Sequence, residues 1–96
     1  MKQTRHKKME QEKLKRIELA INDLHLGKRI QDELKEQGRA VSWLANQLGM
    51  KRTSLYYIFH QNSLDLELLM RISFILDHNF MRDVVDLYDA SQLLPQ

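Results

Sequence analysis

The chain contains no cysteine, one proline and only three glycines among its 96 residues. The absence of cysteine excludes disulfide bonds and metal sites built from thiolates. The single proline, Pro95, stands almost at the end, so no proline interrupts a helix before it. Disulfides are rare in reducing compartments, and we expect a cytoplasmic protein.

Long apolar runs are also missing. No stretch approaches the roughly 18–20 apolar residues of a membrane span. The charged N-terminus has no apolar segment of signal-peptide length. We therefore expect a soluble, intracellular protein with no membrane partner. With 43% hydrophobic and 29% charged residues, the chain can bury a core as one domain.

Strand-like alternation is absent, and good helix formers are plentiful, which predicts an all-α fold. Asn22 or Asp23 could cap the second helix, and Gly38 is placed to end it. Gly49 is expected to end the third helix, and Asp65 to cap the fifth. The first helix carries one apolar stripe at Leu14, Ile17, Ile21 and Leu24. The apolar residues expected on the later helices are Leu26, Ile30, Leu34, Leu44, Leu48, Leu55, Ile58, Leu68, Leu69, Ile72, Ile75, Leu76, Phe80, Val84, Leu87 and Tyr88.

Charge is distributed unevenly, although the formal net charge is only +2. Residues 1–16 hold seven lysines and arginines against two glutamates. Residues 37–64 hold three basic residues and no acid, whereas residues 65–96 hold six acids against two arginines. A polyanion could therefore approach the first two segments and would be repelled by the third.

The acid-free segment contains a pattern typical of a helix-turn-helix. Ala45 is small enough for two helix backbones to cross closely. Gly49, four residues later, can end the first helix at positive φ without a Cβ penalty. Leu55 and Ile58 then lie three apart, on the face that a second helix would turn toward the first. Three further apolar residues complete the expected contact, Leu44, Leu48 and Met50.

This stretch reads WLANQLGMKRTSLYYIF (43–59), and it resembles the helix-turn-helix of the lambda-repressor-like, Xre-type DNA-binding family. The resemblance extends over roughly residues 24–80. It implies a five-helix bundle, here with an extra N-terminal basic helix or arm. It also implies sequence-specific binding of double-stranded DNA by a transcriptional regulator, most simply a repressor that occludes polymerase. The implied division is a basic arm or helix (1–22), a helix-turn-helix domain (23–90) and a C-terminal tail (91–96).

In that family the second helix of the motif lies in the major groove, which assigns the reading of bases to helix 51–60. The expected base contacts are Arg52, Thr53, Ser54, Tyr56 and Tyr57. The expected phosphate contacts are Ser42, Lys51, His60, Gln61 and Asn62. Arg52 can form two hydrogen bonds with guanine O6 and N7. Thr53 and Ser54 could instead cap the helix, and the tyrosines could form a protein-binding patch.

Two positions depart from the family pattern. The family usually has serine or threonine as the cap of each helix of the motif, where this chain has Ala40 and Lys51. Ser42 or Thr53 could take over the capping, which would move the helix starts by one or two residues.

The basic N-terminal segment, with KQTRHKK at 2–8, is compatible with three roles. It could be an arm along DNA phosphates, part of a dimerising helix, or a solvated tail. We expect a homodimer that reads two half-sites, with the dimer contact on the N-terminal or the last helix. We expect the protein to be nucleoid-associated.

Other functions receive less support from the sequence. An antitoxin that holds a toxin partner as well as DNA is the main alternative. Binding to a membrane surface through the N-terminus is weaker, because EQEK (10–13) interrupts its cationic face. We expect no enzyme and no cofactor, because the four histidines are scattered and no nucleophile–base pair or glycine-rich phosphate loop occurs. His25, at a helix start, is expected to be structural.

Overall fold

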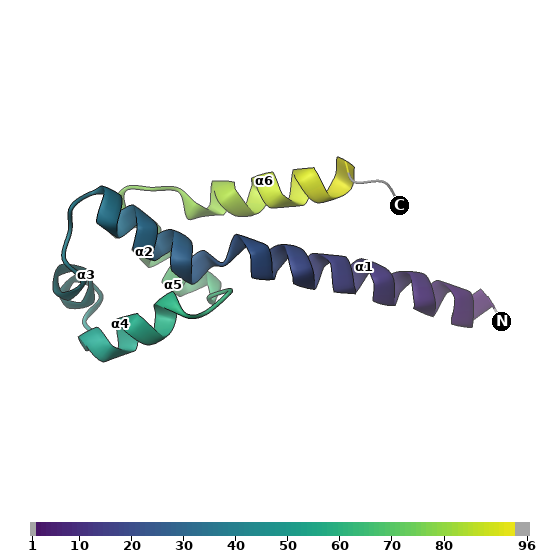
Figure 1. Ribbon diagram of the computed structural model, residues 1–96, viewed down its shortest axis with the longest axis horizontal. Helices are drawn as coiled ribbons and strands as arrows, with labels where there is room; N and C mark the ends of the chain where they lie inside the picture. Colours follow the sequence, from purple (N-terminus) through teal and green to yellow (C-terminus); the bar gives the residue numbers. More distant parts are fainter. Residues whose placement is uncertain (1, 94–96) are drawn as a thin grey trace.

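The computed structural model describes residues 2–93, and every element within them is an α-helix (Figure 1). The helices are α1 (Lys2–Leu24), α2 (Leu26–Glu36), α3 (Val41–Leu48), α4 (Arg52–Phe59), α5 (Leu66–Leu76) and α6 (Phe80–Leu93). The predicted all-α class is confirmed. Helix α6 continues three residues into the predicted tail, and residues 94–96 of that tail, like Met1, lie outside the described residues.

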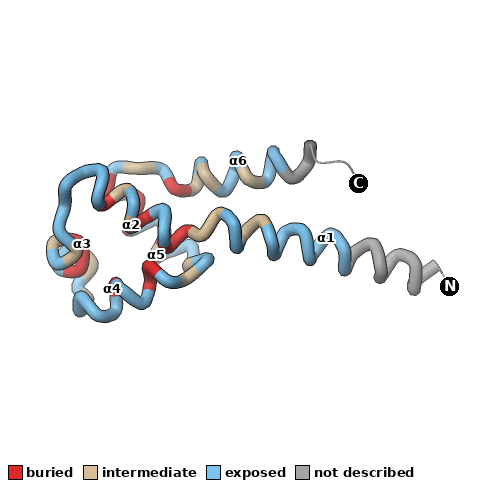
Figure 2. Tube along the Cα trace, in the orientation of Figure 1, coloured by how far each residue is buried: buried red, intermediate tan, exposed pale blue. Residues whose placement is uncertain are grey.

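The core lies between α2, α3, α4 and α5, and the first residue of α6 closes it (Figure 2). Its buried hydrophobic residues are Leu26, Ile30, Leu34, Leu44, Ala45, Leu55, Ile58, Phe59, Leu69, Ile72, Leu76 and Phe80. Residues 11–24 of α1 include no buried side chain, and Leu24 only packs against the edge of the core. The predicted inward faces of α2 to α5 are thus confirmed, and the described side chains of α1 lie outside the core.

The inward face predicted for α6 is wrong beyond the first turn of the helix. Val84 and Tyr88 are exposed and Leu87 is half-buried, whereas Phe80 is fully buried. The reason is that α6 and α1 extend beyond the core toward the same end of the molecule (Figure 1). Past its first turn, α6 has fewer neighbours to cover an apolar stripe.

Three helix ends occur where the sequence predicts them. Gly38 follows α2 and Gly49 ends α3, and both have φ of +67°. A glycine adopts this left-handed backbone with little conformational strain, because it has no Cβ. The Asp65 carboxylate accepts a hydrogen bond from the Leu68 N–H at 2.8 Å and caps α5.

The start of α2 differs from the prediction. Helix α1 continues to Leu24, so neither Asn22 nor Asp23 caps α2. The cap is His25, whose Nδ1 accepts a hydrogen bond from the Lys28 N–H at 3.1 Å. His25 has a left-handed backbone (φ +47°), because this single residue must turn the chain from one helix into the next.

Helices α3 and α4 begin without a side-chain cap. Ala40 and Lys51 have the extended backbone of an N-cap, but neither side chain accepts a hydrogen bond from its helix. The suggestion that Ser42 or Thr53 takes over this role is wrong, because both residues lie inside the helices. The helix starts are therefore not shifted.

Supplying the missing cap of α3 is expected to stabilise the protein. A hydroxyl at position 40 can accept a hydrogen bond from the first turn, so Ala40→Ser should raise the free energy of unfolding by about 1 kcal/mol. Urea denaturation followed by circular dichroism measures the change. Ser42→Ala is the matched control and should stay within about 0.5 kcal/mol of the wild type. If the two variants are equally stable, the first turn of α3 already has another partner.

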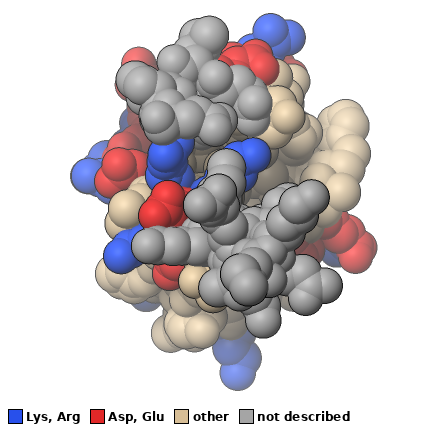
Figure 3. Space-filling view, turned by 90° about the vertical axis from the view of Figure 1, so that its right-hand side faces the viewer, with Lys and Arg blue, Asp and Glu red and all other residues tan. Residues whose placement is uncertain are grey.

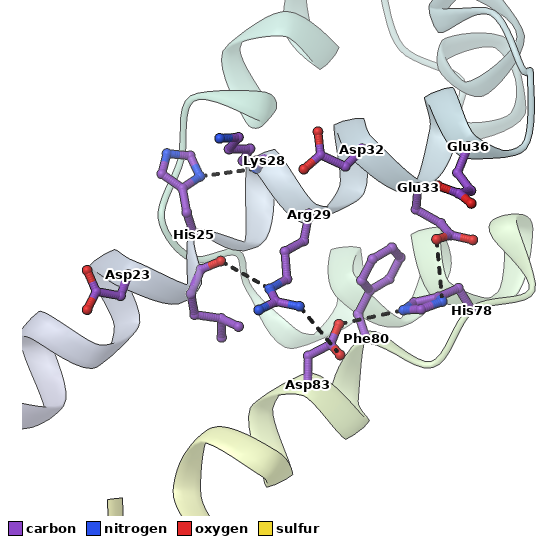
Figure 4. Close-up of a pocket in the computed structure, with 11 residues that line it drawn as sticks. Asp23, His25, Lys28, Arg29, Asp32, Glu33, Glu36, His78, Phe80 and Asp83 are labelled. Atoms are coloured by element: carbon purple, nitrogen blue, oxygen red, sulfur yellow. Dashed lines mark hydrogen bonds and ion pairs between the residues drawn. The ribbon is translucent and has the colours of Figure 1, made fainter. Parts of the chain in front are cut away.

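A polar cluster joins α2 to α6 on the side of α2 that faces away from α4 (Figures 1 and 4). The His78 ring lies between two carboxylates, with Nδ1 3.8 Å from Glu33 and Nε2 3.6 Å from Asp83. The Arg29 side chain lies 4.0 Å from Asp83, and its Nε donates to the Leu24 carbonyl at 3.3 Å. These contacts hold the end of α1 and the start of α6 against α2.

Candidate nucleic-acid interface

Helices α3 and α4 are joined by only three residues (49–51) and share one side of the core. Ala45 of α3 is buried, as are Leu55 and Ile58 of α4. The Met50 N–H donates to the Ala45 carbonyl at 3.0 Å and so ties the turn to the end of α3. The residues predicted to form the contact between the two helices are thus buried or partly buried together.

The C-terminal end of α4 is fixed by the N-terminal end of α2. The Leu26 N–H donates to the Asn62 carbonyl at 2.9 Å, and the Gly27 N–H donates to the Gln61 carbonyl at 3.0 Å. The first N–H groups of a helix have no partner within it, and here the chain after α4 supplies the acceptors. A Cβ on Gly27 would lie 2.6 Å from the carbonyl oxygens of Gln61 and Phe59. The two chain segments can therefore approach this closely only because residue 27 is glycine.

The side of α4 that turns away from the core carries Thr53, Tyr56 and Tyr57, and the exposed His60 follows as the C-cap. Each tyrosine lies three or four residues from both Thr53 and His60, so these side chains are neighbours along the helix. Tyr57 is 68% exposed and Tyr56 45% exposed. The Tyr56 ring contacts the buried Phe59 ring edge-on, with the ring centres 6.0 Å apart. This contact restricts the Tyr56 side chain. Tyr57 is therefore the aromatic side chain that projects most freely from this face.

The N-terminal ends of α3 and α4 add polar and basic groups to this surface. Ser42, Lys51, Arg52 and Ser54 are all exposed. Both helices lack a side-chain cap, so the N–H groups of their first two residues remain available to an external acceptor. The positive end of each helix dipole favours an anion at the same place.

Two of the expected phosphate contacts lie beside α1. The Asn62 amide nitrogen donates to the Asn22 side-chain oxygen at 2.8 Å, and Gln61 is half-buried. Together with α1 they line a groove of about 420 Å³. The structure therefore gathers Ser42, Lys51, Arg52, Thr53, Ser54, Tyr56, Tyr57 and His60 around α4 and the start of α3, whereas Gln61 and Asn62 form the border with α1.

Arg39 belongs to the same surface and was not among the predicted contacts. It is exposed just before α3, and its guanidinium lies 4.2 Å from the centre of the Trp43 ring. Stacking on the ring holds the cation in place without neutralising it. The spacing of four residues between the two side chains and the absence of acids nearby could have identified Arg39.

The acids of the chain lie elsewhere. Residues 37–64, which include α3 and α4, contain none, whereas α6 carries Asp83, Asp86 and Asp89. Helix α6 lies on the other side of α2 from α4 (Figure 1). At the end toward which α1 and α6 extend, Lys and Arg side chains alternate with Asp and Glu side chains (Figure 3). The surface around α3 and α4 is thus basic and polar, with no carboxylate from its own segment.

In the described part of the chain, no group of three or more His, Asp or Glu side chains is placed to hold a metal ion. No helix in this part has both the length and the apolar character required to cross a bilayer. Comparisons with protein-family models, with curated proteins and with solved structures found no match for this chain.

Proposed function

We propose that this protein is a sequence-specific regulator that binds double-stranded DNA with α3 and α4 as a lambda-repressor-like helix-turn-helix. In this arrangement α4 lies in the major groove and presents its first residues to the base edges. The N-terminal end of α3 and Lys51, just before α4, then face the phosphates on either side.

The observation that carries the proposal is the chemistry of the surface around α4. It combines two uncapped helix N-termini with Lys51 and Arg52, and no acid occurs between positions 37 and 64. Phosphates gain from each of these features, because backbone N–H groups, helix dipoles and cations all attract them. Thr53 and Tyr57 add side chains that can reach base edges or a thymine methyl group.

The simplest mechanism of regulation is occlusion of polymerase. One such domain covers little DNA, so a homodimer that reads two half-sites about one helical turn apart is the expected form. The acidic helix α6 lies away from α4 and would be directed away from the duplex (Figure 1).

Selection from a pool of random duplexes at about 0.15 M salt tests the proposal. We expect a short motif that occurs as an inverted repeat, with half-site centres about 10 base pairs apart. Affinity for the selected duplex should exceed affinity for a scrambled duplex by roughly a thousandfold or more.

A control separates specific binding from general attraction to phosphates. The titration is repeated with both duplexes at several salt concentrations, because non-specific binding depends steeply on salt. If no motif is enriched, or if the selected and scrambled duplexes bind alike at every salt concentration, the proposal is wrong. The antitoxin alternative would then be tested by purifying the protein from its own cells and identifying any bound second chain.

A further inference from the structure

Helix α5 exposes an apolar stripe that is not part of the hydrophobic core. Leu66, Met70 and Phe74 are four residues apart and therefore lie in one row along the helix. Their exposed fractions are 65%, 40% and 79%. Phe74 is the most exposed of the large hydrophobic residues among the described side chains. The largest contiguous apolar patch on a monomeric protein is often a functional contact site.

A hollow lies directly beside Phe74. Its volume is about 380 Å³, and its lining residues are Ser73, Phe74, Asp77, His78, Asn79 and Met81. The Ser73 hydroxyl donates to the Leu69 carbonyl at 2.7 Å and lies 3.7 Å from the Met81 sulfur. The Asn79 side-chain oxygen accepts from the Met81 N–H at 3.1 Å. These polar atoms already have partners, so an apolar group can enter the hollow without leaving them unsatisfied.

We infer that this surface binds a second copy of the chain, with Phe74 of each copy inserted into the hollow of the other. A contact around a twofold axis requires one surface to carry both the projecting group and the cavity that receives it. The α5 surface meets this requirement, because Phe74 both projects from the helix and borders the hollow. The two-fold axis then passes near the C-terminal end of α5.

The charges around the stripe favour a protein over a polyanion. Glu67 and Arg71 follow the stripe along α5 and form an ion pair at 2.8 Å, so their charges cancel. Asp77 at the hollow adds a negative charge, which would repel phosphates or an anionic membrane surface. A second copy brings the same balanced pair, but it also brings its own Asp77 close to the axis, and the repulsion between the two carboxylates weakens the dimer.

The size of the stripe predicts a weak dimer in free solution. Specific interfaces bury about 800 Å² on each partner, more than three side chains supply. Val85, which lies one turn after Met81 on α6 and is exposed, can extend the contact. Here the inference rests on the proposed function, since two adjacent half-sites would hold two copies close together and complete a weak contact.

The test compares three substitutions of exposed apolar residues, one on each candidate helix. Phe74→Glu alters α5, Leu14→Glu alters α1, and Tyr88→Glu alters α6; all three side chains are more than half exposed. Sedimentation velocity of the full chain over a range of concentrations gives the dimer dissociation constant. We expect Phe74→Glu to raise this constant about tenfold or more, and the other two to leave it within about twofold. Circular dichroism shows whether each variant is folded, and Leu66→Glu replaces Phe74→Glu if the latter is not.

The outcomes separate this inference from the proposed function. If the wild type is monomeric at all concentrations and binds the two half-sites without cooperativity, the inference is wrong. The apolar stripe would then be a binding site for another protein, such as a toxin. If Leu14→Glu or Tyr88→Glu abolishes the dimer and both α5 variants preserve it, the interface lies on α1 or α6. A dimer sensitive to Phe74→Glu that selects no DNA motif would support the inference and contradict the proposed function.

Discussion

Substituting Arg52 with alanine is expected to weaken binding to the selected duplex by roughly 5- to 150-fold. Arg52 is exposed at the first position of α4, where a helix in the major groove meets the base edges. Its guanidinium can donate two parallel hydrogen bonds to guanine O6 and N7. Alanine removes both donors and leaves the guanine acceptors without a protein partner inside the interface.

The loss should depend on sequence, and this distinguishes contact with a base from contact with a phosphate. The motif selected by Arg52→Ala should become degenerate at one base pair and stay unchanged elsewhere. Fluorescence anisotropy with the wild-type motif gives the change in dissociation constant. Arg82→Ala is the matched control, because it removes the same charge from an exposed position on α6, on the other side of α2 from α4 (Figure 1). We expect that variant to bind within about twofold of the wild type, since surface charges more than about 8 Å from the DNA are largely screened.

Two results would contradict the role of Arg52. An equal loss on every duplex, together with a shallower dependence on salt, would show that Arg52 contacts a phosphate. An unchanged affinity would remove the start of α4 from the interface, and the exposed tyrosines would then be the next residues to substitute.

Local features of this fold follow directly from the sequence. Gly38 and Gly49 occupy left-handed positions because a glycine there has no Cβ to clash, and Asp65 caps a helix with its own side chain. The apolar faces of α2 to α5 follow from helical spacing, because four neighbouring helices cover them. For the two glycines and Asp65, the residues within one helix turn contain the whole physical cause.

Features that depend on distant segments could not be predicted in the same way. The spacing of Val84 and Tyr88 indicates an inward face, but both are exposed because α6 leaves the core. The sequence assigns Asn62 to a phosphate and gives no sign that its amide meets Asn22, forty positions earlier in the chain. The apolar row on α5 has the spacing of a core stripe, and only the structure shows that its three residues lie on the uncovered side.

The candidate site depends both on local helical spacing and on contacts between distant segments. That Arg52, Thr53 and Tyr57 would project from α4 follows from the burial of Leu55 and Ile58 on its other side. The position of α4 is fixed by the contact between its C-terminal end and the start of α2. No sequence pattern indicates that contact, because a glycine in the first turn of a helix has several ordinary explanations.

Substituting Gly27 with alanine is expected to lower the free energy of unfolding by about 2–3 kcal/mol. An added Cβ would lie 2.6 Å from the Phe59 and Gln61 carbonyl oxygens and closer still to that of Ile58. All three are backbone oxygens at or just after the end of α4. The steric clash with the new Cβ can therefore be relieved only if α2 and α4 move apart. In a helix with open space around the glycine, the same substitution raises the free energy of unfolding by up to about 1 kcal/mol. A lowered free energy of unfolding therefore indicates that α2 and the end of α4 lie close together. The melting temperature should fall by roughly 10–20 °C.

The control for this variant is alanine at the next position. Lys28 is exposed, so Lys28→Ala should stay within about 0.5 kcal/mol of the wild type in the same denaturation experiment. A Gly27→Ala protein as stable as the wild type would show that α2 does not lie this close to the end of α4. Where the variant is still folded, it should also bind the selected duplex more weakly than Lys28→Ala does. The clash would displace the C-terminal end of α4, and with it the angle at which Arg52 and Thr53 enter the groove.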